Sequence, residues 1–128
     1  MTLELLTDVL FHCWIKDTAY KTDQANWRET NKALGQCTVT SMIVYDFFGG
    51  KIIRGFSEKY NIYHYWNEIN GEKIDLTFSQ FLEGKGDIQF ERIVQKEKDD
   101  LLKISNVKHR YELLTNRVFD YMKKNHID

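Results

Sequence analysis

The sequence has no proline, few cysteines and no long hydrophobic run, and the last two gaps exclude whole classes of protein. Two cysteines, Cys13 and Cys37, do not make the disulfide framework of a small secreted domain. Neither belongs to a Cys-x-x-Cys pair or a Cys/His cluster, so a structural zinc site is not expected. No apolar run approaches the ~20 residues of a membrane-spanning helix. The absence of proline has no functional interpretation.

An excess of charge of one sign is missing as well. The formal net charge is −1, so electrostatics gives no reason to expect a nucleic acid or a membrane surface as a partner. Residues 1–8 contain acids but no Lys or Arg, unlike the start of a signal peptide, so the expected location is the cytoplasm. Gly49-Gly50 lacks the following Lys-Ser or Lys-Thr of a phosphate-binding loop. No metal or organic cofactor is implied, and the oligomeric state stays open.

The remaining composition is that of one folded domain, residues 1–128, because 42% of the chain is hydrophobic and 14% is aromatic. Apolar residues at three- and four-residue spacing predict amphipathic helices over 2–16 and about 106–122. A third, largely apolar helix is expected to begin near Cys37 and to end at Gly49-Gly50. Together with the strands described below, this pattern predicts an α+β fold.

Between the first two helices, polar residues 17–34 predict a long loop, and loops of this length are often functional. Trp27 is its large apolar anchor, which either fixes the loop to the core or forms the wall of a binding cleft. Residues 51–55 are expected to form a strand, whereas 87–94 form either a strand or the entry to a helix. Thr77-Phe78-Ser79-Gln80 fits the capping box of a short helix.

The clearest local signal is a β-hairpin within residues 60–77. Asn70-Gly71 is the preferred two-residue type I′ turn, and the flanking residues are aromatic or β-branched. This turn sets Trp66 opposite Asp75, and it makes His64 and Asp75 diagonal neighbours on one face, with Cα atoms about 7–8 Å apart. The hairpin therefore predicts an imidazole held beside a carboxylate.

Cys37 is expected near the first turn of the apolar helix, after Gly35, which lets the backbone turn into it. Unpaired N–H groups and the partial positive charge at a helix N-terminus both stabilise a thiolate and lower the pKa of a cysteine there. A thiol, an imidazole and an orienting carboxylate are the parts of a nucleophilic acyl-transfer site. We therefore predict a catalytic group of Cys37, His64 and Asp75.

The motifs around these residues resemble those of papain-like enzymes of the transglutaminase type. The hairpin sequence His64-Tyr65-Trp66-Asn67-Glu68-Ile69, followed by Ile74-Asp75-Leu76-Thr77, is similar to their catalytic hairpin, and Gly35-Gln36-Cys37 is similar to their nucleophile turn. The resemblance implies a cysteine hydrolase or acyltransferase in which His64 is the catalytic histidine and Asp75 the orienting acid. Tyr65 departs from the family pattern, which has a small residue there, and Cys37 and His64 are closer in sequence than usual.

A second resemblance covers most of the chain, and it is to the small bacterial YunG family. The motifs that carry it are Ala33-x-Gly35-Gln36-Cys37-x-Val39-Thr40, Asp46-x-Phe48-Gly49-Gly50, His64-Tyr65-Trp66-Asn67, Ile74-Asp75-Leu76-Thr77 and Arg110-Tyr111-Glu112-Leu113-Leu114. This resemblance supports the interpretation of these motifs as parts of one site, but it implies no substrate.

The sequence therefore leads to two hypotheses. The first is a cysteine-dependent amidase, peptidase or transamidase that acts on an unknown small molecule, peptide or protein, with Gln36, Trp66 and Trp27 as candidate substrate or oxyanion contacts. In it, a papain-like helix that carries the nucleophile packs on a small antiparallel sheet, and the terminal helices complete the core. The second is a binding module that keeps this scaffold without turnover, in which Cys37 is a core residue and His64 a structural one.

Overall fold

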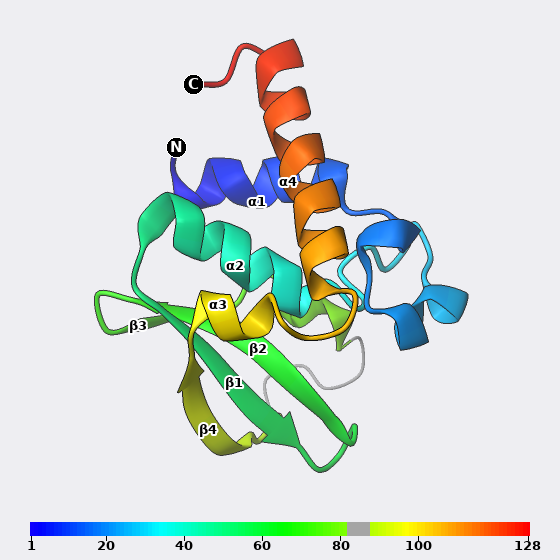
Figure 1. The fold of residues 1–128 in the computed structure, drawn as a ribbon, viewed down its shortest axis with the longest axis vertical. Helices are drawn as coiled ribbons and strands as arrows, with labels where there is room; N and C mark the ends of the chain where they lie inside the picture. The colour runs from blue at the N-terminus through cyan, green and yellow to red at the C-terminus, as the bar shows by residue number, and fades with distance from the viewer. Residues whose placement is uncertain (82–87) are drawn as a thin grey trace.

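The computed structural model describes residues 1–81 and 88–128 of the chain (Figure 1). The helices are α1 (Leu3–Cys13), α2 (Cys37–Phe48), α3 (Lys98–Leu101) and α4 (Val107–Lys124), with the 3₁₀ turns η1 (Lys16–Thr18), η2 (Lys21–Asn26) and η3 (Phe78–Gln80). The strands are β1 (Lys51–Ser57), β2 (Ile62–Ile69), β3 (Glu72–Ile74) and β4 (Glu91–Lys96). The fold is α+β: helices α1, α2 and α4 gather on one side of the molecule, and the sheet lies below them (Figure 1).

The four strands form one antiparallel sheet in the order β3-β2-β1-β4. The expected hairpin is confirmed, with Ile69 opposite Glu72 and Asn67 opposite Ile74. Both turn residues adopt positive φ, 52° at Asn70 and 81° at Gly71, as a type I′ turn requires. Because β3 ends at Ile74, no strand of the described residues covers the outer edge of the first half of β2, which includes His64.

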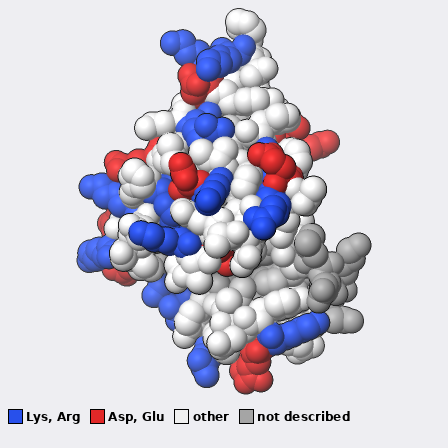
Figure 2. All heavy atoms as spheres, turned by 90° about the vertical axis from the view of Figure 1, so that its right-hand side faces the viewer, with Lys and Arg blue, Asp and Glu red and all other residues white. Residues whose placement is uncertain are grey.

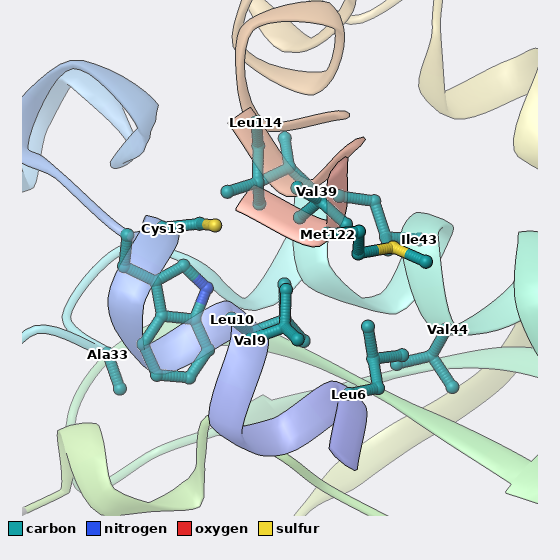
Figure 3. Packing of buried hydrophobic residues seen from close by; sticks show 12 residues of the cluster. Leu6, Val9, Leu10, Cys13, Ala33, Val39, Ile43, Val44, Leu114 and Met122 are labelled. Atoms are coloured by element: carbon teal, nitrogen blue, oxygen red, sulfur yellow. The ribbon is translucent and has the colours of Figure 1, made fainter. Parts of the chain in front are cut away.

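The main core lies between the three long helices (Figure 3). It is built from the apolar stripes of α1 and α4 and from the upper face of α2, and Leu10, Ile43 and Leu114 are among its buried members. Cys13 belongs to this cluster and is buried, as expected of a small core residue. Burial of these stripes fixes the three helices relative to one another and so fixes the start of α2.

Helix α2 also packs on the sheet, through the residues of β2 that point toward it. Tyr65 lies in a second buried cluster with Met42, and the side-chain amide of Asn67 donates to the carbonyl of Ser41 at 2.9 Å. At its other end, α2 is tied to α3 and α4, because Asp46 contacts Lys98 at 2.6 Å and accepts a hydrogen bond from the Tyr111 hydroxyl. The helix is thus held at both ends, which positions Cys37 against β2.

Three local expectations need correction. The segment 17–34 is not a plain loop, because it contains η2 and the end of η1. The strand expected within 87–94 is present as β4, which begins at Glu91, and residue 87 lies outside the described residues. The capping box at Thr77 is wrong: η3 is a single 3₁₀ turn without a side-chain cap, and Gln80 bonds elsewhere. Among the described residues, no helix has the length and apolar character needed to cross a membrane.

Candidate functional site

The first residue of α2 is Cys37, and the turn that leads into it depends on Gly35. Gly35 has φ of 75°, and a Cβ atom there would lie 2.9 Å from the backbone nitrogen of Tyr20. The carbonyl of Gly35 also accepts the N–H of Tyr20 at 2.8 Å. A glycine is therefore required both for the backbone conformation and for the close approach of the chain. This turn sets the half-buried Cys37 at the positive end of the helix dipole.

His64, on β2, lies fully buried beside Asp75, which follows β3. The imidazole Nε2 is 2.7 Å from Oδ2 of Asp75, whose other oxygen accepts the N–H of Thr77 at 3.2 Å. Phe81 and Phe90 pack on the imidazole, with ring centroids 4.8 Å and 5.5 Å from it. The aromatic cage and the carboxylate together leave the imidazole one orientation, in which Nδ1 is the nitrogen that points away from Asp75.

Cys37 and His64 shift each other's protonation. Burial alone raises the pKa of the Cys37 thiol, but the contact with His64 and a backbone hydrogen bond from Tyr65 outweigh it, so the pKa lies below its ordinary value. Burial alone lowers the pKa of His64, but Asp75 and Cys37 outweigh it and raise the pKa to about 9. Both shifts favour a thiolate beside an imidazolium, which is the nucleophilic form of such a pair.

Cys37 lines a cleft of about 560 Å³ beside the first half of β2. The walls come from the loop before α2, from β1 and β2, and from the start of α4; they include Tyr20, Asp23, Arg54, Tyr63 and Arg110. A volume of this order suits a small molecule or a few residues of a peptide. Cys37 is thus part of the cleft wall, whereas its partner His64 is not among the lining residues and has 0% exposure.

Gln80, on η3, bonds to two parts of the site, although the sequence pattern predicts it as part of a capping box. Its Oε1 accepts the N–H of Gly35 at 3.2 Å, and its Nε2 lies 2.8 Å from Nδ1 of His64. Because an N–H group only donates, the bond from Gly35 fixes the amide orientation and turns the N–H of Gln80 toward Nδ1. This bond stabilises neutral His64 and opposes its protonation. The sequence signal was a glutamine three residues after Thr77, which predicted a local cap instead.

This geometry yields a prediction for Gln80→Leu. Without the competing N–H donor, the imidazolium gains stability, so the apparent pKa of the Cys37 thiol should fall further, by about one pH unit. Iodoacetamide labelling of Cys37 between pH 5 and about 7 measures this as faster alkylation than in the wild type. Gln95→Leu, on the exposed side of β4, is the matched control and should leave the profile unchanged. Slower labelling of Gln80→Leu would show that Gln80 positions His64 instead of opposing its charge.

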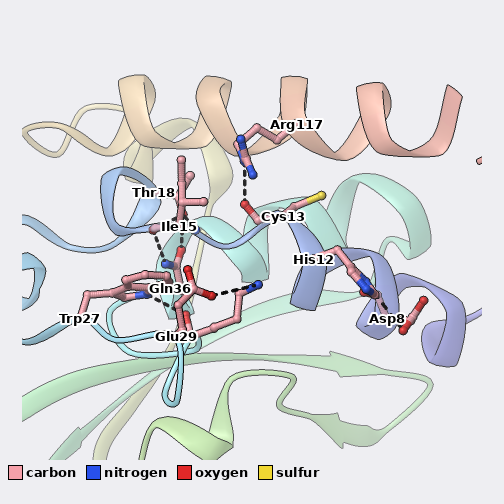
Figure 4. A network of polar contacts seen from close by, with 10 residues as sticks. Asp8, His12, Cys13, Ile15, Thr18, Trp27, Glu29, Gln36 and Arg117 are labelled. Carbon is pink, nitrogen blue, oxygen red and sulfur yellow. Dashed lines mark hydrogen bonds and ion pairs between the residues drawn. The ribbon is translucent and has the colours of Figure 1, made fainter. Parts of the chain in front are cut away.

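The three candidate contact residues lie outside the cleft. Both amide atoms of Gln36 are engaged, since Oε1 accepts from the Thr18 hydroxyl at 2.8 Å and Nε2 donates to the Ile15 carbonyl at 3.0 Å (Figure 4). Trp27 donates to the carbonyl of Lys32 and holds its own loop together (Figure 4). Trp66 shares the face of His64, as expected, but is 6% exposed and packs behind it. Their placement argues against direct contact with a substrate.

A metal site has no counterpart in the described residues, where no three side chains of His, Cys, Asp or Glu gather at ligand distance. Among the residues that the sequence singles out, Cys37, His64 and Asp75 lie together, and Gln80 also bonds to His64.

Comparison with known proteins places the chain in a family. The sequence profile of the family described as YunG protein matches residues 2–123. A protein of Bacillus subtilis (strain 168), described as uncharacterized protein YunG, is 26% identical over 109 residues, which cover 85% of this chain and 86% of the relative. No solved structure matches the chain significantly. Since the profile covers nearly the whole sequence, the chain belongs to the YunG protein family.

Proposed function

We propose that this protein is a cysteine-dependent acyl-transfer enzyme, of the amidase, peptidase or transamidase type, with a papain-like arrangement of its site. The observation that carries the proposal is the alignment of three groups: Cys37 at the start of α2, His64 beside it on β2, and Asp75 at 2.7 Å from the imidazole. The order of nucleophile helix, histidine strand and acid on the next strand is that of transglutaminase-like enzymes, which supports the assignment without fixing the substrate.

In the first half of the reaction, Sγ of Cys37 attacks the carbonyl carbon of an amide or ester. His64 takes the thiol proton at Nδ1, because Nε2 is occupied by Asp75. The S–C bond forms, and the electron pair of the carbonyl moves to its oxygen. The N–H of Thr40 donates to the carbonyl of Gln36, the residue just before α2. The N–H groups that precede Thr40 in the helix, including that of Cys37, have no carbonyl partner within it, so the N–H of Cys37 can donate to this oxyanion.

Collapse of this intermediate breaks the bond between the carbonyl carbon and the leaving nitrogen or oxygen, which receives the proton from His64. The product that stays is a thioester on Cys37. Water or an amine then attacks the thioester carbonyl and gives its proton to His64, which returns it to the sulfur as the thiol is released. Water makes the protein a hydrolase, and an amine makes it a transferase. Asp75 keeps the imidazole in one tautomer throughout.

The proposal is tested with p-nitrophenyl acetate, an activated ester that needs no specific binding. A burst of nitrophenolate, about one per chain, followed by a slower phase is expected, together with an acetyl group on Cys37 in mass spectra. Cys37→Ala should abolish both signals, whereas Cys13→Ala, which removes the buried core thiol, should retain them. Acetylation that is equal on the two cysteines, or that needs unfolding of the chain, would rule out an activated Cys37.

The second hypothesis, a binding module without turnover, rests on a different observation. Gln80 occupies Nδ1 of His64, the nitrogen that would exchange protons with the thiol. On the face shown in Figure 2, acidic and basic side chains are interspersed, so no patch of one sign there marks a protein or nucleic-acid partner. The acetylation experiment separates the two hypotheses, because a pure binding module forms no acyl-enzyme.

A further inference from the structure

Arg110, on the first turn of α4, is a buried cation that faces the same cleft as Cys37. Its side chain is 3% exposed, yet it is among the residues that form the cleft wall. Burying a guanidinium is costly unless hydrogen bonds or an opposite charge compensate it. Its bonding partners therefore indicate what the residue is for.

The hydrogen bonds of Arg110 use one end of the guanidinium. Nη1 donates to the carbonyls of Thr18 and Gly35, at 3.2 Å and 3.5 Å. Nε is buried without a hydrogen-bond partner, and Nη2 makes no hydrogen bond to the described residues. Nε and Nη2 form the edge of the guanidinium that binds a carboxylate with two parallel hydrogen bonds. The edge that can hold a carboxylate in this way is thus the one without a hydrogen-bond partner among the described residues.

No acidic side chain of the described residues lies within ion-pair distance of Arg110. The nearest candidate, Asp23, lines the cleft and feels the charge of Arg110, but burial outweighs this attraction and raises the pKa of its carboxyl. Arg54 adds a second cation to the wall, over the ring of Tyr63 at 4.3 Å. Among the described lining residues, two arginines therefore face Asp23 and the Cys37 thiolate, and the imidazolium of His64 offsets the charge of the thiolate, which leaves the cleft attractive to an anion.

We propose that Arg110 binds a carboxylate of the substrate, so that the amide or ester attacked by Cys37 belongs to an anionic molecule. This inference rests on the proposed acyl-transfer function and gives its substrate class. The carboxylate bonds to the Nε–Nη2 edge of Arg110, in the cleft that also holds the thiol. The carbonyl bonds of Nη1 fix the guanidinium to the turn of Gly35, so that anion recognition is built into the nucleophile turn.

Two alkylating reagents test this charge preference directly. Iodoacetate and iodoacetamide both form an S–C bond to the thiolate as iodide leaves, but only iodoacetate carries a carboxylate. The quantity measured is the rate with iodoacetate divided by the rate with iodoacetamide. This ratio does not depend on the thiolate fraction, because both reagents need the same ionised form of Cys37. In the native protein this ratio should exceed that of the unfolded chain by about tenfold, the size expected of a cleft that concentrates an anion.

Variants identify the source of the preference. Arg110→Gln should reduce the ratio by about tenfold, Arg110→Lys should give an intermediate ratio, and Asp23→Asn should increase the ratio. Lys108→Gln, which removes an exposed charge from the same helix, is the matched control and should not change it. Circular dichroism reports whether each variant folds. If Arg110→Gln does not fold, Asp23→Asn decides, since a ratio that does not rise would contradict an anion-selective cleft.

The outcomes distinguish the two proposals. If Cys37 reacts quickly with iodoacetamide but Arg110→Gln keeps the wild-type ratio, carboxylate binding by Arg110 is overturned and acyl transfer stands. In that case the imidazolium of His64 is the source of any preference for iodoacetate. If native Cys37 reacts no faster than the unfolded chain with either reagent, the thiol is not activated, and both proposals fall.

Discussion

His64→Ala is expected to slow the alkylation of Cys37 at neutral pH by about a hundredfold. The reason is the balance of effects on the thiol: burial raises its pKa, and His64 is the strongest influence that lowers it. Without the imidazole, burial prevails over the remaining hydrogen bond from Tyr65, so the pKa moves above its ordinary value. Iodoacetamide rates measured across pH 5 to about 10, with the modified residue identified by mass spectrometry, show the shift directly.

His109→Ala is the matched control for this experiment, because His109 is exposed on α4 and lies outside the cleft walls. Its labelling profile should match that of the wild type. The His64→Ala variant opens a cavity beside Phe81 and Phe90, so its unfolding midpoint in urea must be measured alongside. A folded His64→Ala variant that labels as fast as the wild type would contradict the coupling of thiol and imidazole.

The pH dependence of stability follows from the same coupling, and its sign differs for the two groups. The raised pKa of His64 contributes stability that is complete below its ordinary range near 6.5 and is lost as pH rises through about 9. The lowered pKa of Cys37 contributes stability above its ordinary value of 9.0, which is lost as pH falls through the folded pKa. Between these limits, folding adds a proton to His64 and removes one from Cys37, so the pair contributes little to the pH dependence of the free energy of unfolding.

Much of this site could be predicted from short-range rules in the sequence. The Asn70-Gly71 turn has one favoured register, and a β-strand alternates its side chains, so His64 and Asp75 had to share a face. Cys37 could be placed because Gly49-Gly50 ends the helix and Gly35 precedes it, which leaves little freedom for its first turn. These are local constraints, and the structure obeys them.

The parts that sequence reasoning missed depend on contacts between distant segments. Gln80 was assigned to a local cap, but its amide bonds Gly35 and His64, which no local rule connects to it. Gln36 sits next to the nucleophile, yet both of its amide atoms serve the segment from Ile15 to Thr18. Arg110 was visible only as part of a family motif, because its burial beside the cleft depends on how α4 packs.

Trp66 illustrates a subtler limit of pattern reasoning. Its face was predicted correctly, but sharing a face with His64 does not bring it into the cleft. The cleft is lined by Tyr63 and Tyr65, which lie on the other face of β2, whereas the Trp66 ring packs on Phe90 and approaches Gly55, where a Cβ atom would be 2.6 Å from it. Alternation along a strand shows which residues share a face, and only the tertiary packing shows on which face a cleft forms.

The second large effect is expected for Asp75→Asn, which keeps the size of the side chain and changes its hydrogen bonding. The Asn carbonyl oxygen can still accept the N–H of Thr77, as Oδ1 of Asp75 does. This leaves the Asn NH₂ group facing Nε2 of His64, which must then become an acceptor. The imidazole proton consequently moves to Nδ1, where it faces Cys37 and Gln80 and prevents proton uptake from the thiol.

The rate of acyl-enzyme formation with p-nitrophenyl acetate should therefore fall by roughly 10²–10⁴, as expected when a catalytic histidine is held in the wrong tautomer. Asp75→Asn also removes the carboxylate that raises the pKa of His64, so the imidazolium loses stability and the thiol pKa rises. Asp120→Asn, on the exposed side of α4 where Asp120 contacts Lys124 at 3.0 Å, is the matched control and should leave acylation unchanged. An Asp75→Asn variant that acylates as fast as the wild type would mean that His64 needs no orienting acid. The aromatic rings of Phe81 and Phe90 and the amide of Gln80 would then suffice to hold the imidazole in its useful tautomer.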